Sequence, residues 1–409
     1  MSSILIKNVN VVTACGDEVL ENTSIAIKDD KIIAIEDMSK NPSNYDKIID
    51  GNDNFLLPGF IDAHVHIMAN GFLNVDYMND PLSYYFCKGI KNMKVTLEAG
   101  VTTARDCGLA DVGIKRAAEN KIIKSPKFQI SVIPLSITGG HFDLYLNSGH
   151  DMIVTYPGFP HPVCDGVEGA IAKTREVLRA RADFVKVMAT GGVVSANDAP
   201  EDIQFNVKEL KAIVDEAKRM GNRKVVTHCH GLGGIKTSIK AKVHSIEHGT
   251  FVDKKSAEKI AEKGIFLVPT FSVIKAQIKQ AKNRELPPDK IPKALEVGKV
   301  HQENMEMAYN QGVKMVMGTD SGVHEHGKNL AELNYLHKMG MDPLETIRAG
   351  TIESAKCLEL ENEIGSIEKG KIADIVLTNI DPRDSISKLQ NPDNILMVMQ
   401  DGKIVKSNI

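Results

Sequence analysis

Two histidines, His64 and His66, close an apolar run that opens with a Pro-Gly turn, in the stretch LLPGFIDAHVHI (56–67). In a β-strand, residues i and i+2 point to the same face, so both imidazoles can reach one cation where the strand ends at a pocket. A surface strand that happens to carry two histidines would show the same pattern. The pair alone therefore leaves a metal site and a solvated strand open.

Further residues with metal-ligand chemistry stand at the ends of later strand-like runs. The runs DFVKVMATGG, VVTHCHG, HSIEHGT and VKMVMGTD contribute Lys186, His228 with His230, His248, and Asp320. Neutral imidazole and carboxylate suit Zn²⁺, and a catalytic zinc site keeps one position open for water or substrate. The repeated pattern favours a metal-dependent active site assembled from the ends of several strands.

The segments between these runs have the pattern of amphipathic helices, as in VKELKAIVDEAKRMG (207–221) and KKSAEKIAEKG (254–264). Alternating strands and helices are typical of an α/β protein with a parallel sheet and helical crossovers. We predict eight strands, which end near His64, Arg105, Ser131, Lys186, His228, His248, Thr270 and Asp320. Eight βα units over roughly 300 residues are the size of a closed (β/α)8 TIM barrel, whose active site lies at the C-terminal ends of its strands.

With these residues in order, the chain resembles the metal-dependent amidohydrolase superfamily. Within it, SITGGHFD, KVMATGGVVS, THCHGLGG, SIEHGTF and GTDSG are similar to the prolidase-like and Xaa-Arg/Xaa-Lys dipeptidase branch, which is related to imidazolonepropionases. The resemblance implies a centre of two Zn²⁺ or other divalent ions. Its ligands would be His64, His66 and Asp320 on one ion, His228 and His248 on the other, and Lys186 between the two.

The bridging position constrains the chemistry of Lys186. An ordinary ammonium, with a reference pKa of ~10.4, would add positive charge between two cations. Carboxylation of the side-chain nitrogen by CO₂, as in similar enzymes, gives an anionic carbamate with two oxygens. A structural salt bridge is the alternative for this lysine.

The implied mechanism is attack by a hydroxide that bridges the two ions. The ions lower the pKa of bound water from ~15.7 toward ~7, which makes hydroxide available at neutral pH. Asp320 would take the proton as general base and later return it to the leaving nitrogen as acid.

Two further histidines are candidate substrate contacts. His141 follows two glycines in a motif similar to the GGH of the dipeptidase branch, and its ring could polarise the scissile carbonyl or stabilise the oxyanion. His230 competes with His228 for the metal. Because the first histidine of this motif is the ligand in similar enzymes, we expect His230 to bind substrate, for example its carboxylate.

Two more histidines, His324 and His326, follow Asp320 in GVHEHGKN. They are expected either at the rim of the site or in a solvated loop.

Both ends of the chain read as short strands outside the barrel. Residues 1–57 contain ILIKNVNVV, SIAIKDDKIIAIE and KIIDGNDNFLL, and residues 365–409 contain IADIVL and ILMVMQDGKIV, with Gly, Asn and Asp at the turns. Neither arm has enough apolar residues for a core of its own. We therefore expect 1–57 and 365–409 to form one composite β-sandwich domain beside a hydrolase barrel at 58–364.

Composition limits the partners and the cellular compartment that we expect for this protein. The net charge of −3 gives no electrostatic reason to expect nucleic acid or an anionic membrane as a partner. No stretch reaches the ~18 apolar residues of a membrane helix. The six cysteines lack CxxC spacing, as expected for reduced thiols of a cytoplasmic protein. The expected partner is a small-molecule or dipeptide substrate, and a homo-oligomer is possible.

Substrate choice depends on two segments. The loop 138–165 is long enough to be functional and is expected to cover the barrel mouth, and 271–292 is expected to form a second wall. Neither has an acidic cluster for a C-terminal Arg or Lys, which slightly favours Xaa-Pro among the expected amides: Xaa-Pro, Xaa-Arg/Lys and N-acyl amino acids. Cyclic amides of the imidazolone type, lactones and phosphoesters stay open, because the same centre attacks them.

Overall fold

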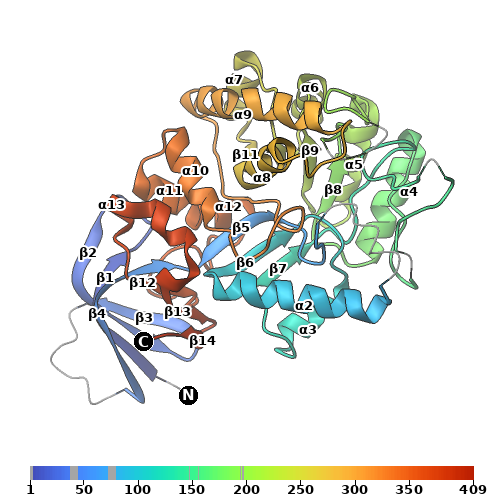
Figure 1. Ribbon diagram of the computed structural model, residues 1–409. Helices are drawn as coiled ribbons and strands as arrows, with labels where there is room; N and C mark the ends of the chain where they lie inside the picture. Colours follow the sequence, from blue (N-terminus) through green and yellow to red (C-terminus); the bar gives the residue numbers. More distant parts are fainter. Residues whose placement is uncertain are drawn as a thin grey trace.

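The computed structural model describes residues 3–36, 45–71, 80–146, 148–154, 156–193, 195 and 198–409. A barrel of parallel strands is surrounded by helices, and a separate sheet lies at one side of the barrel, where the two chain ends meet (Figure 1). Among the described residues, no helix is long and apolar enough to cross a membrane.

In the described part of the chain, seven regular strands form two parallel arcs of the barrel. One arc contains β5 (Phe60–Val65), β6 (Val101–Asp106) and β7 (Lys127–Ile130), and the other contains β8 (Val185–Met188), β9 (Val225–Cys229), β10 (Ser245–His248) and β11 (Phe266–Val268). All neighbouring pairs within each arc are parallel.

Backbone hydrogen bonds join the two arcs. Between β7 and β8, Leu135 N donates to Lys186 O at 2.8 Å, and Met188 N donates to Leu135 O at 2.9 Å. On the opposite side, segment 314–320 lies between β11 and β5. Leu267 N donates to the carbonyl at position 314, and Ala63 N donates to the carbonyl at position 317, both at 2.9 Å. The predicted eighth strand is thus an irregular segment that closes the barrel.

Helices follow the strands along the chain. They are α2 (Leu82–Glu98), α3 (Val112–Glu119), α4 (Gly166–Arg179), α5 (Val207–Arg219), α6 (Leu232–Ala241), α7 (Lys254–Lys263), α8 (Phe271–Lys282), α9 (Ile291–Asn310), α10 (Ala331–Met339), α11 (Pro343–Ala349) and α12 (Ile352–Cys357). The helices predicted at 207–221 and 254–264 are α5 and α7. Asn206 begins α5 with a capping box, in which its side chain and that of Glu209 accept each other's backbone N–H groups.

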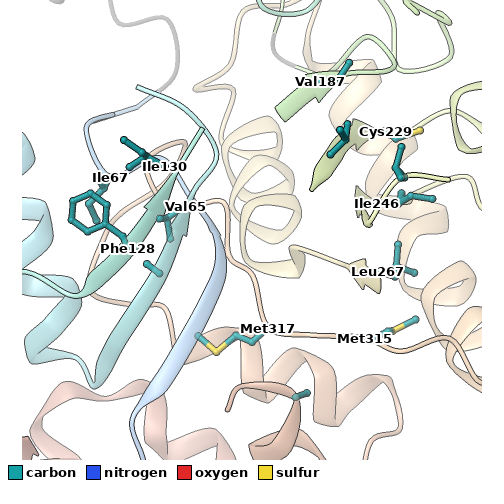
Figure 2. Packing of buried hydrophobic residues seen from close by; sticks show 14 of the residues in the cluster. Val65, Ile67, Phe128, Ile130, Val187, Cys229, Ile246, Leu267, Met315 and Met317 are labelled. Carbon is teal, nitrogen blue, oxygen red and sulfur yellow. The ribbon is translucent and has the colours of Figure 1, made fainter. Parts of the chain in front are cut away.

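Successive residues of a barrel strand point alternately to the apolar core under the helices and to the cavity inside the barrel. In β8, Val185 and Val187 belong to the same buried cluster as Leu210 and Ile213 of α5, whereas Lys186 lines the cavity inside the barrel. Figure 2 shows this cluster, with apolar side chains contributed by both arcs and by segment 314–320. Each fully buried Val or Ile contributes about 1.5–3 kcal/mol relative to exposure.

The two chain ends share one seven-stranded mixed sheet. Its order is β14–β13–β12–β4–β1–β2–β3, formed by β1 (Ser3–Val12), β2 (Val19–Lys28), β3 (Lys31–Glu36), β4 (Lys47–Pro58), β12 (Ile375–Thr378), β13 (Ile395–Gln400) and β14 (Lys403–Ser407). This sheet has its own buried apolar cluster, to which both ends contribute. The predicted fold, a TIM barrel with a composite β domain, is confirmed, while the limits at 57/58 and 364/365 stay predictions. Three short elements of the described chain lie between β12 and β13: α13 (Pro382–Ser385) and the 3₁₀ helices η2 (Ile386–Gln390) and η3 (Pro392–Asn394).

Candidate metal centre

The first group of candidate ligands comes from β5 and from the segment that closes the barrel. The Nε2 atoms of His64 and His66 lie 3.5 and 3.3 Å from Oδ1 of Asp320. Ligand atoms of all three residues lie within 4.8 Å of one another, and all three side chains are buried. The structure therefore brings together the three residues that the sequence assigned to one ion.

The second group comes from the ends of β9 and β10. Ligand atoms of His228, His230 and His248 lie within 4.8 Å of one another. Nε2 of His228 is 3.3 Å from the Gly191 carbonyl, which leaves Nδ1 for a metal, and Nδ1 of His230 is 2.8 Å from Oγ1 of Thr250, which leaves Nε2. The predicted pair is thus present with His230 beside it, and the assignment of His228 as the ligand stays a prediction.

Lys186 lies in the same cavity as both groups. Its side chain is 1% exposed, and its Nζ has no hydrogen-bond partner among the described residues. Among the described residues, Lys186 therefore forms no salt bridge, which was the structural alternative for this lysine. A buried nitrogen that has no partner in the described part of the chain, next to two groups of metal-binding side chains, fits a carboxylated lysine between two divalent ions.

Burial sets the protonation of the candidate ligands. Desolvation and the nearby Lys186 charge lower the pKa of His64 to about 4, and desolvation and the His141 charge lower the pKa of His230 to about 3. Burial raises the pKa of Asp320, but the charges of His64 and His66 outweigh it and give a pKa of about 2. Neutral imidazoles and an ionised carboxylate are the forms that bind metal.

Two candidate ligands have unusual backbone conformations. His248 has φ of 70° and Asp320 has φ of 59°, in the left-handed region that few residues other than Gly adopt. In β10 the preceding residue, Glu247, also reaches the barrel interior, where it contacts His64. The left-handed residue at the strand end allows two consecutive side chains to serve one site, which simple alternation forbids. Backbone strain of this kind is concentrated at functional sites.

Sequence reasoning did not identify Glu247. Its Oε2 is 2.8 Å from Nδ1 of His64, and its Oε1 accepts hydrogen bonds from Arg105 at 2.9 Å and from Ser245 at 2.5 Å. Burial raises the pKa of Glu247, but the charge of Arg105 and the contact with His64 hold it well below its usual range. The thiol of Cys107 also lies near His64 and Glu247, and burial raises its pKa to about 12.

The remaining predicted site residues lie in two different pockets. His141 and His230 line the cavity with the candidate ligands, and the rings of His141 and His228 stack with centroids 4.3 Å apart. His324 and His326 line a neighbouring surface pocket instead, and their Nε2 atoms lie 2.9 and 3.0 Å from the carbonyls of Thr319 and Ala69.

Both predicted walls contribute to the cavity. From the loop 138–165, Phe142 lines it beside His141, while residues 147 and 155 of that loop lie outside the described residues. From 271–292, helix α8 contributes Val273, Ile274 and Gln277. The polar atom Oε1 of Gln277 is buried and has no hydrogen-bond partner among the described residues.

Comparisons with known proteins agree with this geometry. Residues 55–405 match the amidohydrolase family. An ochratoxinase from Aspergillus niger is 31% identical over 410 residues, which cover 96% of this chain and 84% of that protein. The crystal structure of a Xaa-Pro dipeptidase with methionine bound in its active site is 31% identical, with a TM-score of 0.91 over 99% of this chain and all of that one.

A further solved structure is similar over the same extent. A prolidase complexed with N-methylphosphonate-L-proline is 29% identical, with a TM-score of 0.91, and the match covers 99% of this chain and all of that chain. The family match, which spans the barrel, and the converging metal-binding side chains lead to one conclusion: this chain belongs to the amidohydrolase family, as a metal-dependent hydrolase of C–N bonds.

Proposed function

We propose that the protein hydrolyses the amide bond of a dipeptide or N-acyl amino acid with an apolar C-terminal residue, Xaa-Pro among them, using two Zn²⁺ ions and a carboxylated Lys186. The observation that carries the proposal is the Nζ of Lys186, which has no hydrogen-bond partner among the described residues and is buried in one cavity with both groups of candidate ligands. When bound, the two ions would supply Lewis acidity and an activated water.

The chain's own residues supply the other steps. His64, His66 and Asp320 would hold one ion, His228 and His248 the other. Asp320, ionised and within 3.5 Å of two imidazoles, would accept the proton of the attacking water and return it to the leaving nitrogen. His141 would face the carbonyl oxygen, and His230 the substrate carboxylate.

The cavity lining supports the choice of an apolar C-terminal residue. Among the described lining residues, Asp320 is the only carboxylate. The side walls of the cavity are apolar and are formed by Phe142, Met188, Val193, Val273, Ile274 and Val323. A C-terminal Arg or Lys would lose its hydration without gaining an ionic partner, which costs free energy. The relatives fit this choice, since one is a Xaa-Pro dipeptidase and another is complexed with a proline derivative.

The test is amine release by Zn²⁺-loaded protein, supplied with bicarbonate, across Xaa-Pro, Xaa-Arg/Lys, Xaa-hydrophobic and N-acyl amino-acid substrates. We expect cleavage of Xaa-Pro or of hydrophobic C-terminal residues, and little of Xaa-Arg/Lys. Silence across the library from protein shown to carry metal would reject the amide substrates and redirect the search to cyclic amides, lactones and phosphoesters.

A further inference from the structure

The buried carboxylate of Asp198 lies close to Nδ1 of His141. Nδ1 of His141 lies 2.9 Å from Oγ of Ser195 and 3.4 Å from Oδ2 of Asp198, whose side chain is 3% exposed. The ring stacks on His228, with centroids 4.3 Å apart. Nδ1 therefore faces the loop after β8, while the His141 side chain also lines the cavity.

The hydrogen bonds of Asp198 fix its carboxylate in place. Oδ1 accepts from Gly192 N at 3.0 Å and from the Ser195 hydroxyl, and Oδ2 accepts from Nε2 of Gln204 at 3.2 Å. The other end of the Gln204 amide, Oε1, accepts from the backbone N of His141 at 3.0 Å. Asp198 and Gln204 therefore hold both the ring and the backbone of His141.

The backbone of the same loop packs directly against the ring. A Cβ at Gly192 would lie 2.0 Å from Cε1 of His141 and 2.5 Å from its Nδ1. Only glycine permits this approach. The loop is itself held from outside by Lys290 and Lys293, whose ammonium groups donate to the carbonyls of Ser195 and Asp198.

The hydrogen-bond directions define the proton on His141. The Ser195 hydroxyl donates to Asp198, so its oxygen can only accept from His141. Burial raises the pKa of Asp198, but the hydrogen bond and charge of His141 outweigh it and lower the pKa to about 2, so the carboxylate is ionised. The Ser195 oxygen and the Asp198 carboxylate both act as acceptors toward Nδ1, and Nδ1 therefore carries a proton.

We propose that Asp198 is a positioning residue for the reaction: through Nδ1–H it orients the ring of His141, which lines the cavity. The inference rests on the proposed function. A carboxylate that holds a histidine in one tautomer and one orientation has the same role in other hydrolases. Asp198 touches no reacting atom, and its effect on the reaction passes through His141.

A double-mutant cycle tests this dependence. Asp198→Asn should lower kcat by about 100-fold with little change in KM, since the lost contact is made in the transition state. In a His141→Ala background, the same substitution should change kcat by less than about 3-fold. Asp202→Asn, the same change at an exposed position of the same loop, is the control. Equal losses in both backgrounds would assign Asp198 a structural role only and overturn the proposal.

A second measurement does not need the substrate. Imidazole ¹⁵N NMR, with His141→Ala used to assign the signals, should show a protonated Nδ1 at His141 in the wild-type protein and a changed pattern in Asp198→Asn. An unchanged pattern would overturn the proposal even if no substrate is found. If Asp198→Asn unfolds, Ser195→Ala keeps the carboxylate, and Nδ1 should stay protonated. Absence of all wild-type turnover, with the expected NMR pattern, would reject the proposed function alone.

Discussion

Oε2 of Glu247 lies 2.8 Å from Nδ1 of His64, and both side chains are buried. Because Glu247 is ionised beside Arg105, Nδ1 of His64 is the donor, and Nε2 is left unprotonated toward Asp320. A carboxylate that accepts from the far nitrogen of a metal-binding histidine fixes its tautomer and orientation and raises its basicity. Arg105 thus supports the candidate metal centre through Glu247.

We expect Glu247→Gln to weaken metal binding by about 10- to 100-fold, because the amide cannot offer the same charged acceptor to His64. Competition with a chelator for Zn²⁺ measures the affinity. Glu353→Gln, which removes a carboxylate paired with Lys356 at the surface, is the matched control. Equal affinity in the Glu247 variant and the control would show that His64 needs no such partner.

Replacement of Lys186 tests the bridge. Lys186→Ala should reduce the bound metal from two ions to one or fewer and lower turnover by at least about 100-fold, because the anion between the ions is lost. Added short-chain carboxylates should restore part of both. Metal analysis and ¹³C NMR with labelled bicarbonate, which should reveal a carbamate in the wild-type protein alone, are the measurements.

Lys224→Ala, which removes a surface lysine paired with Glu359, controls for the loss of a lysine elsewhere in the barrel. Full metal content in Lys186→Ala would contradict a bridging role and leave the two ions to be held by the histidines and Asp320.

Much of this site could be predicted, because its residues stand at the ends of strands. The pair His64 and His66 follows from two-residue periodicity, and Lys186 alternates with apolar neighbours that pack under α5. Glu247 could not be found in this way, since alternation places it on the face opposite His248. The left-handed backbone of His248, which no local pattern encodes, brings both side chains inside. The partners of His141 were equally hidden, because they come from a loop without periodicity.

The buried carboxyl group of Glu332 predicts how the unfolding free energy depends on pH. Its carboxyl accepts hydrogen bonds from the backbone N–H groups of Phe271 and Ser272, at the start of α8, and from the Ser272 hydroxyl. Burial is the main influence and raises the pKa to about 8, although these hydrogen bonds oppose it. The folded protein therefore binds a proton here that the unfolded chain releases near pH 4.5.

The sign follows from linkage. Between pH ~4.5 and ~8 the folded state holds more protons than the unfolded state, so this group's contribution to stability is complete below pH ~4.5 and is lost as pH rises through ~8. We expect Glu332→Gln to flatten the decline of the unfolding free energy over this interval. Chemical denaturation at several pH values measures it. Parallel curves for the wild-type protein and the variant would place the ionisation elsewhere, for example on the buried Asp62.

Asp320 combines two roles that a conservative substitution can separate. Asp320→Asn keeps an oxygen near His64 and His66 but cannot take a proton, so we expect most of the metal to remain while kcat falls by about 10²- to 10⁴-fold. Metal content and steady-state kinetics on the same preparation measure both effects. Retained turnover would remove Asp320 as the general base, and lost metal would make it mainly a ligand.

Gln277 predicts how substrate choice can be changed. Its buried Oε1 has no partner among the described residues, and it shares α8 with Val273 and Ile274, which face the same cavity. In Gln277→Glu, the new carboxylate would be a buried acceptor on the α8 wall, and a charged hydrogen bond to a basic substrate would form there. We expect the ratio of kcat/KM for Xaa-Lys to that for Xaa-Pro to rise by about 10-fold or more. Competition between the two dipeptides measures this ratio directly.

Gln280→Glu makes the same change in the neighbouring surface pocket and should leave the ratio unchanged. The same ratio in both variants would mean that the substrate's C-terminal side chain does not reach this part of α8.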